Sequence, residues 1–348
     1  MSESPPFVSV IMSVYDGHKY LGQTIESVLG QTYRYFEFII IDDGSSDGSL
    51  DIIQSYKEKD SRIILIQNET NIGLALSLNK GIQIAQGKYL ARMDADDICL
   101  PDRFKMQVEF LEQNPGIWIL GCNVFHIDEQ GEIIKEGKYA TDSNDLRWNM
   151  LFGKSGVICH PCVMMVAEKI RESGLYDDVR SSQDLELFSR FILLDPLPLF
   201  NLQIPLVKCR WHSNSFSIKH AKLQHEVSDR IRLATLNRVF EKNYPLEVVS
   251  EFRTLTSQNS TKINQELISL ISTWFKIWKD FQTKFNLSGI EMKPKFEQLF
   301  FRIKNLIVIN PFSSKSTAVH LCKLIPLIGI TPSLMIIKNK LSTKLVRQ

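Results

Sequence analysis

The chain has 348 residues, 44% of them hydrophobic and 23% charged, which is ordinary for a globular protein and long enough for one large domain or two. Its net charge of +2 hides an asymmetry, because residues 1–204 carry 18 basic and 30 acidic side chains, a net charge of −12, whereas residues 205–348 carry 23 and 9, a net charge of +14. A chain of this size does not depend on disulfide bonds, and its basic rear part predicts an anionic partner, either a membrane surface or a nucleic acid.

The cysteines and the N-terminus indicate a protein that is made and kept in the cytosol. Six cysteines are scattered along the chain, which is typical of a reducing compartment: Cys99, Cys122, Cys159, Cys162, Cys209 and Cys322. Segment 159–162 matches C-x-x-C, but no second Cys/His pair has zinc-knuckle spacing, which argues against a metal or redox role. The first seven residues, MSESPPF, contain neither a basic nor an apolar signal-peptide region, so we expect no signal peptide.

Apolar and amphipathic segments alternate from residue 8 onward. The apolar, β-branched segments predict strands at 8–15, 36–44, 62–68, 88–94 and 117–128. The amphipathic segments predict helices at 20–31, 49–57, 74–85 and about 101–113, the last of them starting at Pro101. This alternation predicts an α/β fold with a mostly parallel, doubly wound sheet and helices on both of its faces.

Polar residues gather where the first four predicted strands end, at Tyr15-Asp16, Asp42-Asp43, Asn68 to Gly73, and Asp94 to Asp97. Ligands of doubly wound sheets bind beyond the carboxyl ends of the strands, so these segments predict one binding crevice. The first strand is followed by neither G-x-G-x-x-G nor G-x-x-x-x-G-K-[ST], the glycine-rich loops that hold phosphates. A phosphate bound here would therefore need a cation, for which the aspartates are candidate ligands.

The last of these segments, the acidic cluster of Asp94, Asp96 and Asp97, needs a physical explanation. Crowded carboxylates raise one another's pKa values and destabilise a fold unless a cation, a basic side chain or water compensates their charge. A divalent metal ion is one explanation, and a solvated loop that leads into the helix at Pro101 is the simpler alternative. Arg92, just before the cluster, is a hypothetical internal counter-charge.

The sequence resembles family-2 glycosyltransferases, which have the nucleotide-sugar-binding fold called GT-A. The resemblance covers residues 7–217 and rests on the segments VSVIMSVYDGHKYLGQTIESVLGQTYRYFEFIIIDDGSSDGS, NIGLALSLNKGIQIAQGKYLARMDADD, LPDRF, CHPCVMM, QDLELFSR and CRWHSNSFS. The D-x-D motif of the acidic cluster is weak alone, but the combination is specific. The resemblance implies a doubly wound mixed sheet of the GT-A type over residues 1–217. The match ends there, and helical periodicity and charge predict a helical, basic region over residues 218–348.

The resemblance implies a donor site made by four loops. Tyr15 would line the nucleotide-base pocket, and Asp43 would accept a hydrogen bond from the base. Asn71 and Gly73 would bind the nucleotide sugar, and Asp94 would lie beside the ribose and the metal. From the residues alone, Asp43 also fits a simple turn.

The resemblance also implies a metal site and a general base. Asp96 would be the direct ligand of Mn²⁺ or Mg²⁺, with Asp94 beside it, and His212 would approach the metal or the diphosphate. Asp184 would be the general base, although the family pattern has Glu where this chain has Gln183, which puts the hydrogen bonding around the base in doubt. A divalent ion stabilises a leaving diphosphate, and one carboxylate base without an opposed nucleophile implies inversion at the anomeric carbon.

Several of these residues have structural alternatives. Asp184 lies at a helix start in SSQDLELFSRFILL, where an acid stabilises the helix without any catalysis, and Glu186 is a second candidate base. His212 fits a surface loop as well as it fits a metal contact. His160 fits a structural or an acceptor-site role, and Asp47 fits a helix cap.

The rear of the chain is predicted to be helical and to contact a membrane or a protein. Segment 263–285 has helical periodicity and places Trp274, Phe275 and Trp278 near one face with lysines between them. The longest uncharged stretch, Leu324 to Ile337, has 14 residues, fewer than the roughly 20 that span a bilayer. We expect peripheral contact with a membrane surface; a helical cap on the catalytic domain or on a partner is the alternative, and no nucleic-acid-binding module is recognisable.

Together these observations predict a cytoplasmic, metal-dependent, inverting glycosyltransferase of the hexosyl or N-acetylhexosaminyl class. It would move a sugar from a nucleoside diphosphate sugar, with UDP as the expected nucleotide, to a glycan or lipid-linked acceptor at the inner face of the membrane. A sugar nucleotidyltransferase is the enzymatic alternative, although SVYDGHK lacks the Gly- and Arg-rich signature expected after its first strand. A degenerate nucleotide-sugar-binding protein without turnover is the non-enzymatic alternative.

Overall fold

The computed structural model describes residues 7–153, 157–212, 215, 219–256 and 265–287. The chain divides into two compact units, Met1–Thr235 and Leu236–Gln348, and the division falls within helix α9 (Ala221–Phe240). The domain boundary expected from the sequence, between residues 217 and 218, lies before this helix and stays a prediction.

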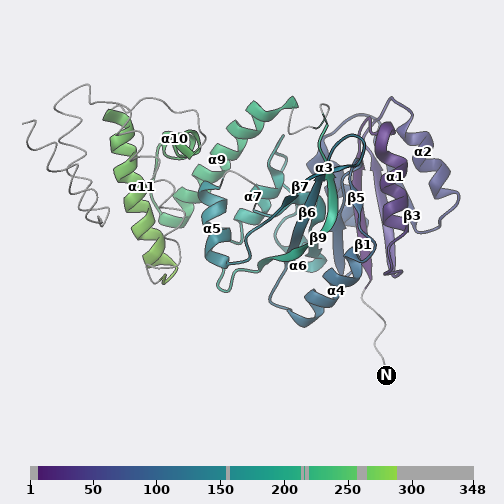
Figure 1. The fold of residues 1–348 in the computed structure, drawn as a ribbon, viewed down its shortest axis with the longest axis horizontal. Coiled ribbons are helices and arrows are strands. Elements are labelled where there is room, and N and C mark those ends of the chain that lie inside the picture. Colours follow the sequence, from purple (N-terminus) through teal and green to yellow (C-terminus); the bar gives the residue numbers. More distant parts are fainter. Residues whose placement is uncertain (1–6, 154–156, 213–214, 216–218, 257–264, 288–348) are drawn as a thin grey trace, which may run out of the picture. The chain divides into compact units, whose positions relative to one another are not determined.

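Among the described residues, the first unit is built on a mixed sheet of nine strands (Figure 1). The strands are β1 (Val8–Val14), β2 (Phe36–Asp42), β3 (Ile63–Gln67), β4 (Tyr89–Arg92), β5 (Ile98–Cys99), β6 (Ile119–Ile127), β7 (Ile133–Gly137), β8 (Met164–Val166) and β9 (Leu199–Arg210). Their order across the sheet is β3-β2-β1-β4-β8-β6-β9-β5, and β7 pairs with β6.

Helices connect most of these strands. They are α1 (His18–Leu29), α2 (Ser49–Lys57), α3 (Leu74–Ile84), α4 (Arg103–Gln113), α5 (Ser143–Phe152), α6 (Ala167–Glu172) and α7 (Gln183–Ser189), and a 3₁₀ turn (His160–Cys162) precedes β8. Figure 1 shows α1 and α2 beside β3, and α5 and α7 on the side of the sheet where β6 and β7 are labelled.

The strands that lead into the predicted crevice run parallel to one another. β1 pairs in parallel with β2 and with β4, and β2 pairs in parallel with β3. Val14 therefore lies opposite Asp42, Asp42 lies opposite Gln67, and Ile11 lies opposite Arg92. The carboxyl ends of the four strands share one edge of the sheet, where the four polar segments meet.

Helices cover both faces of these strands. On one face, alternate β1 residues such as Val10 and Met12 join a buried core that includes α1, α2 and α4, with Leu21, Ile25, Val28, Ile53, Phe104, Val108 and Leu111. On the other face α3 packs closely at Gly81, where a Cβ atom would lie 2.8 Å from Ile11 Cγ2. Burial on both faces explains why these strands read as continuous apolar segments.

The expected fold class, a doubly wound mixed α/β sheet with helices on both faces, is confirmed. The expectation of a mostly parallel sheet holds for β1 to β4 but not for the whole sheet. Of the eight strand pairings among the described residues, four are antiparallel, and each of these involves β5, β7 or β8. The last predicted helix begins at Arg103 rather than at Pro101.

The described part of the second unit is helical, as expected, and contains α10 (Glu247–Thr256) and α11 (Gln265–Lys284). Trp274 is 1% exposed, and its indole N–H donates to the Val248 carbonyl oxygen at 2.7 Å. Trp274 is therefore a core residue of this unit. The side chain of Phe275 and the stretch from Leu324 to Ile337 lie outside the described residues.

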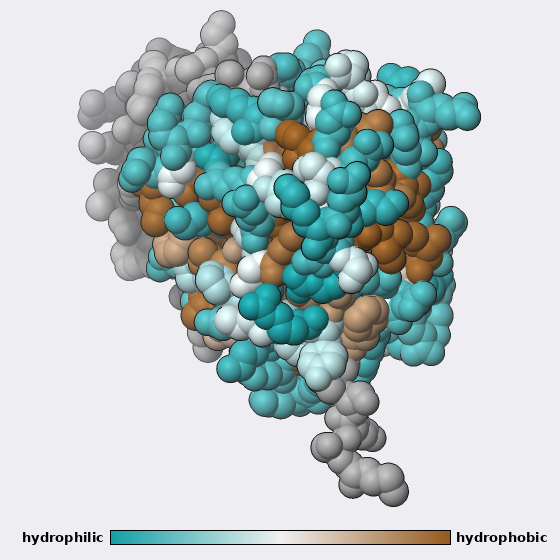
Figure 2. Space-filling model, turned by 90° about the vertical axis from the view of Figure 1, so that its right-hand side faces the viewer, coloured by the Kyte–Doolittle hydropathy of each residue, from teal (hydrophilic) through white to brown (hydrophobic). Residues whose placement is uncertain are grey.

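The described surface carries hydrophobic side chains in separate places. Figure 2 shows one face of the molecule, where hydrophilic residues predominate and hydrophobic residues emerge between them. Scattered apolar side chains of this kind are normal on protein surfaces. Within the described part of the chain, no helix has both the length and the hydropathy that crossing a bilayer requires.

Candidate active site

The acidic cluster lies in the turn that follows β4. Asp94, Asp96 and Asp97 each offer one carboxylate oxygen, and these atoms all lie within 4.8 Å of one another. The side chains of Asp94 and Asp96 are 34% and 32% exposed, whereas Asp97 is 3% exposed. The buried Asp97 does not fit the fully solvated loop that is the alternative explanation, whereas Asp94 and Asp96 remain partly open to solvent.

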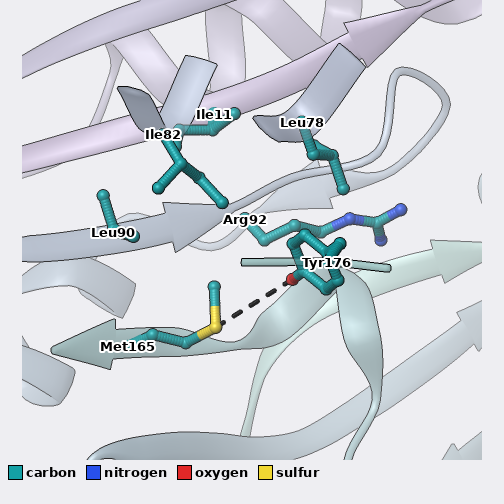
Figure 3. A pocket seen from close by; sticks show the side chains of 7 residues that line it. All are labelled: Ile11, Leu78, Ile82, Leu90, Arg92, Met165 and Tyr176. Atoms are coloured by element: carbon teal, nitrogen blue, oxygen red, sulfur yellow. Dashed lines mark hydrogen bonds between the residues drawn. The ribbon is translucent and has the colours of Figure 1, made fainter. Parts of the chain in front are cut away.

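Arg92 is the counter-charge that the sequence suggested, and its partner is Asp94. Arg92 Nη2 forms an ion pair with Asp94 Oδ1, and the arginine is 4% exposed. Figure 3 shows the guanidinium beside the Tyr176 ring and pointing away from Leu90 and Met165. Arg92 Nε and Nη1 have no hydrogen-bond partner among the described residues. The ion pair with Asp94 is therefore the main compensation for this buried charge.

Two side chains of the acidic cluster, those of Asp94 and Asp97, have pKa values above the ordinary value of an aspartate. Burial raises the pKa of Asp94 to about 6; the Arg92 guanidinium opposes this rise, and the Asp96 carboxylate adds to it. Burial, together with the carboxylates of Asp96 and Asp94, raises the pKa of Asp97 well above its usual value. A divalent cation would relieve this repulsion, and its binding would release protons.

His212 lies against the acidic cluster, although 116 positions separate it from Asp96 in the sequence. His212 Nε2 is 2.8 Å from Asp96 Oδ2, and the histidine side chain is 13% exposed. Its ring centroid lies 5.3 Å from that of Tyr20 in α1. The structure therefore brings two of the predicted metal ligands together, which favours the metal-site interpretation of His212 over a surface loop.

Arg210 is buried between the acidic cluster and α1. Its backbone N–H donates to Asp97 Oδ1 at 2.8 Å, and its Nε donates to the Asp96 carbonyl oxygen at 3.0 Å. Its two Nη atoms donate at 3.0, 3.1 and 2.8 Å to the carbonyl oxygens of Asp128 and Glu129 and to Gln23 Oε1. The guanidinium carbon lies 4.3 Å from the Tyr20 ring centroid, and the arginine is 5% exposed.

Asp43, the predicted partner of the nucleotide base, is 2% exposed and packs against the loop after β3. Its Oδ1 accepts from Asn68 Nδ2 at 2.8 Å and from the Ile72 N–H at 3.0 Å. Its Oδ2 accepts from the N–H of Gly73 at 2.9 Å, where a φ of +93° favours glycine. Asp43 therefore shapes the loop of residues 68–73, and its contact with a base stays a prediction.

Tyr15 and Asn71 are exposed on the loops that flank Asp43. Tyr15 follows β1 and is 54% exposed, and Asn71 lies in the exposed part of the loop after β3. The Asp43 backbone N–H donates to the carbonyl oxygen of Val14, the neighbour of Tyr15, at 2.8 Å. The residues of the predicted base pocket thus meet at one edge of the sheet, and their contacts with a nucleotide stay predictions.

Side-chain hydrogen bonds join the loops that follow β1 and β2. Asp16 Oδ1 accepts from the Ser46 N–H at 2.8 Å, and Asp47 Oδ2 accepts from the His18 N–H at 2.9 Å. Asp47 Oδ1 also accepts from the Ser49 N–H, in the first turn of α2, at 3.0 Å. Asp47 therefore binds the first turns of two helices, in agreement with the helix-cap interpretation.

Asp184, the predicted base, lies in the first turn of α7. Burial raises its pKa, and the Leu185 N–H and the Arg92 guanidinium oppose that rise. Glu186, the second candidate base, forms an ion pair with Arg190 and accepts from its Nε at 3.0 Å. The structure therefore leaves Asp184 as the better candidate of the two.

His160 is held in the interior next to β4. It is 9% exposed, and its Nε2 atom is 2.8 Å from the Tyr176 hydroxyl oxygen. Burial and the Arg92 guanidinium lower its pKa well below the usual value, which keeps the imidazole neutral. These contacts favour a structural role for His160.

The C-x-x-C segment forms no metal site in the described structure. Cys159 Sγ lies 3.6 Å from Cys209 Sγ, and burial raises the pKa of the Cys162 thiol well above its usual value. Within the part of the chain that the structure describes, the acidic cluster is the group of His, Cys, Asp and Glu side chains with metal-ligand spacing. Protonated, buried thiols are poor nucleophiles and poor metal ligands.

Tyr176 was not among the predicted site residues, and Arg210 was recognisable only as the arginine of the Arg-x-His motif that ends in His212. The position of Arg210 two residues before His212 was the available signal, but nothing in that spacing shows that its guanidinium turns towards α1. Tyr176 has no motif around it, and only the fold places its ring beside Arg92 (Figure 3).

The sequence is similar to known glycosyltransferase sequences. The sequence model of glycosyl transferase family 2 matches residues 9–174. The putative glycosyltransferase EpsE of Bacillus subtilis is 35% identical over 248 residues, which cover 68% of this chain and 87% of EpsE. An uncharacterized glycosyltransferase of Haemophilus influenzae is 30% identical over 325 residues, 90% of this chain and 98% of the relative. The amylovoran biosynthesis glycosyltransferase AmsE of Erwinia amylovora is 31% identical over 205 residues, 58% of this chain and 75% of AmsE.

Solved structures share the fold. TarS 1–349 of S. aureus, in complex with UDP, aligns with a TM-score of 0.50 and 17% identity over 86% of this chain and 88% of the TarS chain. The mannosyltransferase PcManGT of Pyrobaculum calidifontis, in complex with GDP-Man and Mn²⁺, aligns with a TM-score of 0.51 and 14% identity over 99% of this chain and 87% of the other. At these identities the likeness concerns the fold alone.

Proposed function

Because the chain belongs to glycosyl transferase family 2, has the GT-A fold and is a glycosyltransferase, we propose that it moves a sugar from a nucleoside diphosphate to a glycan or lipid-linked acceptor with inversion. The observation that carries this proposal is the contact of Asp96 with His212, 2.8 Å apart, at the edge of the sheet where the polar loops meet. The contact joins two distant motifs at the place where a doubly wound sheet binds its ligand.

We propose that Asp94, Asp96 and His212 hold Mn²⁺ or Mg²⁺. The residues fit such an ion, because carboxylate oxygens of Asp94 and Asp96 lie within 4.8 Å of each other, His212 Nε2 is 2.8 Å from Asp96 Oδ2, and oxygen donors suit both ions. PcManGT, which shares the fold, was solved with Mn²⁺. When bound, the ion would supply Lewis-acid stabilisation of the charge that develops on the leaving diphosphate.

Asp184 is the proposed general base. A hydroxyl attacks poorly until a nearby carboxylate accepts its proton, and a carboxyl group whose pKa is raised is a stronger base. Burial raises the pKa of Asp184, whereas Glu186 is bound by Arg190. Direct attack by the acceptor hydroxyl, with a single base, inverts the anomeric carbon.

Tyr15, Asp43, Asn71 and Gly73 are the proposed donor-binding residues, with Asp94 beside the ribose. The carboxylate of Asp43 suits a base that presents a ring N–H, as both uracil and guanine do. TarS was solved with UDP, and PcManGT with GDP-Man. UDP remains the expected nucleotide, and GDP is the alternative that binding measurements must include.

We propose that residues 1–217 form the catalytic domain and that the basic region 218–348 contacts the anionic inner face of the cytoplasmic membrane. The relative AmsE carries the name of amylovoran biosynthesis, which supports a glycan acceptor and a role in polysaccharide synthesis.

Flotation of the full chain with vesicles tests the membrane contact. We expect binding to anionic vesicles that weakens at high salt. Equal, weak binding to anionic and neutral vesicles would contradict it.

The proposed reaction is tested by incubating the protein with UDP- and GDP-sugars and Mn²⁺ and by following release of the nucleoside diphosphate. The Asp96→Asn variant should lose both the release and the effect of Mn²⁺ on nucleotide affinity. The exposed Asp51→Asn variant, in α2, is the matched control and should behave as the wild type. Release of pyrophosphate would identify a nucleotidyltransferase, and tight nucleotide binding without release would identify a degenerate binding protein.

A further inference from the structure

Thr24 and Arg210 lie at hydrogen-bond distance from three consecutive carbonyl oxygens of the acidic cluster, and two of these oxygens share the single Thr24 hydroxyl proton. Thr24 Oγ1, on the buried face of α1, lies 3.0 Å from the Ala95 carbonyl oxygen and 2.8 Å from that of Asp97. The carbonyl between them, that of Asp96, accepts from Arg210 Nε at 3.0 Å. The orientation of a peptide plane sets the direction in which the neighbouring side chains leave the backbone. These contacts therefore fix the orientation of the carboxylates of the acidic cluster.

Arg210 also binds a side chain of the acidic cluster. Its backbone N–H donates to Asp97 Oδ1 at 2.8 Å, and His212, the neighbour of Asp96, lies two residues further along the chain. Between them the Tyr20 ring contacts both the Arg210 guanidinium, at 4.3 Å, and the His212 ring, at 5.3 Å. One residue therefore sets the positions of Asp96, Asp97 and the start of the His212 segment.

The guanidinium of Arg210 has little capacity left for a substrate. An arginine side chain has five N–H donors, and four of those of Arg210 point to protein oxygens within hydrogen-bond distance. One face of the group lies over the Tyr20 ring, and the whole residue is 5% exposed. A diphosphate ligand would need an open fork of donors, which this arrangement does not offer.

The positive charge of Arg210 is available to the acidic cluster. Its four acceptors are backbone carbonyl and amide oxygens, and within the described residues it forms no ion pair with a carboxylate. A buried cation without a carboxylate of its own lowers the cost of crowded anions nearby. The guanidinium therefore lies beside the acidic cluster without a carboxylate partner, and its hydrogen bonds fix the geometry of the cluster.

From these contacts we infer that Arg210 and Thr24 are positioning residues of the metal centre, which brace the acidic cluster against α1 and do not bind the diphosphate. The inference rests on the proposed function, because it assigns these residues to the metal site named there. In this arrangement the carboxylates of the acidic cluster already have their binding geometry before the metal and the donor bind.

The test compares nucleotide affinity with and without metal. Isothermal titration calorimetry measures the dissociation constant of UDP or GDP, whichever the wild type binds more tightly, in Mn²⁺ and again in EDTA. The metal factor is the dissociation constant in EDTA divided by the dissociation constant in Mn²⁺. The variants are Arg210→Lys, which keeps the charge but not the fork, and Thr24→Val, which removes only the hydroxyl. Thr32→Val is the matched control, because its hydroxyl donates to Asp102 Oδ1 at 2.8 Å, away from the acidic cluster.

We expect both Arg210→Lys and Thr24→Val to reduce the metal factor, by about tenfold for Arg210→Lys, while affinity in EDTA and the Thr32→Val metal factor stay at the wild-type values. A lower melting temperature alone would not change the metal factor, so Thr24→Val decides the matter if Arg210→Lys folds poorly. Equal losses of affinity in Mn²⁺ and EDTA for Arg210→Lys would make Arg210 a diphosphate ligand and overturn the inference, as would unchanged metal factors in both variants. A wild type without any metal factor would instead overturn the proposed function, and the inference with it.

Discussion

The guanidinium of Arg92, the last residue of β4, is buried and forms an ion pair with the partly exposed carboxylate of Asp94, two residues further along the chain. Arg92 is 4% exposed, and two of its three nitrogen atoms have no hydrogen-bond partner among the described residues. The pair therefore compensates a charge inside the domain and, at the same time, orients the first aspartate of the D-x-D motif. The same contact therefore affects both the stability of the fold and the proposed metal site.

Breaking this pair from either side should destabilise the fold. Arg92→Met leaves the Asp94 carboxylate, which is 34% exposed, without its partner, and Asp94→Asn leaves the buried Arg92 charge without its own, so we expect each to lower the free energy of unfolding by about 1–3 kcal/mol. The double variant should lose less than the sum of the two single losses, by about 1 kcal/mol or more. Urea unfolding of the four proteins gives these values. Strict additivity would show that the two side chains do not depend on each other.

Asp43 should affect donor binding through the loop of residues 68–73. In Asp43→Asn, an amide NH₂ replaces one carboxylate oxygen and faces donors such as the Gly73 N–H, which accepts nothing in return. We expect the free energy of unfolding to fall by about 1–3 kcal/mol and nucleotide affinity to fall equally in Mn²⁺ and in EDTA. A loss of affinity that appears only in Mn²⁺ would contradict the assignment of Asp43 to the base side of the site.

Asp184 and Glu186 should differ sharply in catalysis. Asp184→Asn removes the proposed proton acceptor, so we expect transfer to slow by about 10²–10⁴-fold while donor affinity stays near the wild-type value. Glu186→Gln is the control, because Glu186 is occupied by Arg190, and it should retain transfer within a few fold. The comparison requires initial rates and donor dissociation constants for both variants. Similar losses of the transfer rate in the two variants would contradict the assignment of Asp184 as the general base.

Metal affinity should rise with pH through the range in which Asp94 titrates. Its pKa in the fold, about 6, exceeds the ordinary value of 3.8, so its contribution to stability is complete below pH 3.8 and is lost as the pH rises through 6. Metal binding needs the deprotonated carboxylate, so Mn²⁺ affinity should increase by up to about tenfold per pH unit below pH 6 and change less above it. Titrations of the wild type with Mn²⁺ between pH 5 and 7.5 provide the profile. Affinity that is constant over this range would mean that no cluster carboxyl releases a proton.

The parallel half of the sheet could be predicted from the sequence because its physical signal is local. The segments of β1, β2 and β4 are largely apolar because helices bury both of their faces, and polar residues mark where they end. The strands β5 and β8 have two and three residues, too few to show any period. They form by pairing with distant strands, so only the tertiary fold defines them.

The candidate site could be predicted only in part for the same reason. Asp96 and His212 were recognisable in separate motifs, but their contact spans 116 positions, and that of Arg210 with Asp96 spans 114. Whether an arginine binds a phosphate or a backbone carbonyl depends on which groups surround it, and spacing carries no information about that. Asp43 likewise looked like an open ligand, because its three hydrogen bonds come from the next loop along the chain.

The central claim concerns what the acidic cluster binds, and a crystal structure of the wild type with Mn²⁺ and UDP tests it most directly. Anomalous scattering at the manganese edge locates the ion independently of the protein density. The account predicts a peak in contact with the Asp96 carboxylate and with phosphate oxygens of the nucleotide, close to His212. A nucleotide bound with its phosphates elsewhere, and no anomalous peak beside Asp96, would contradict it.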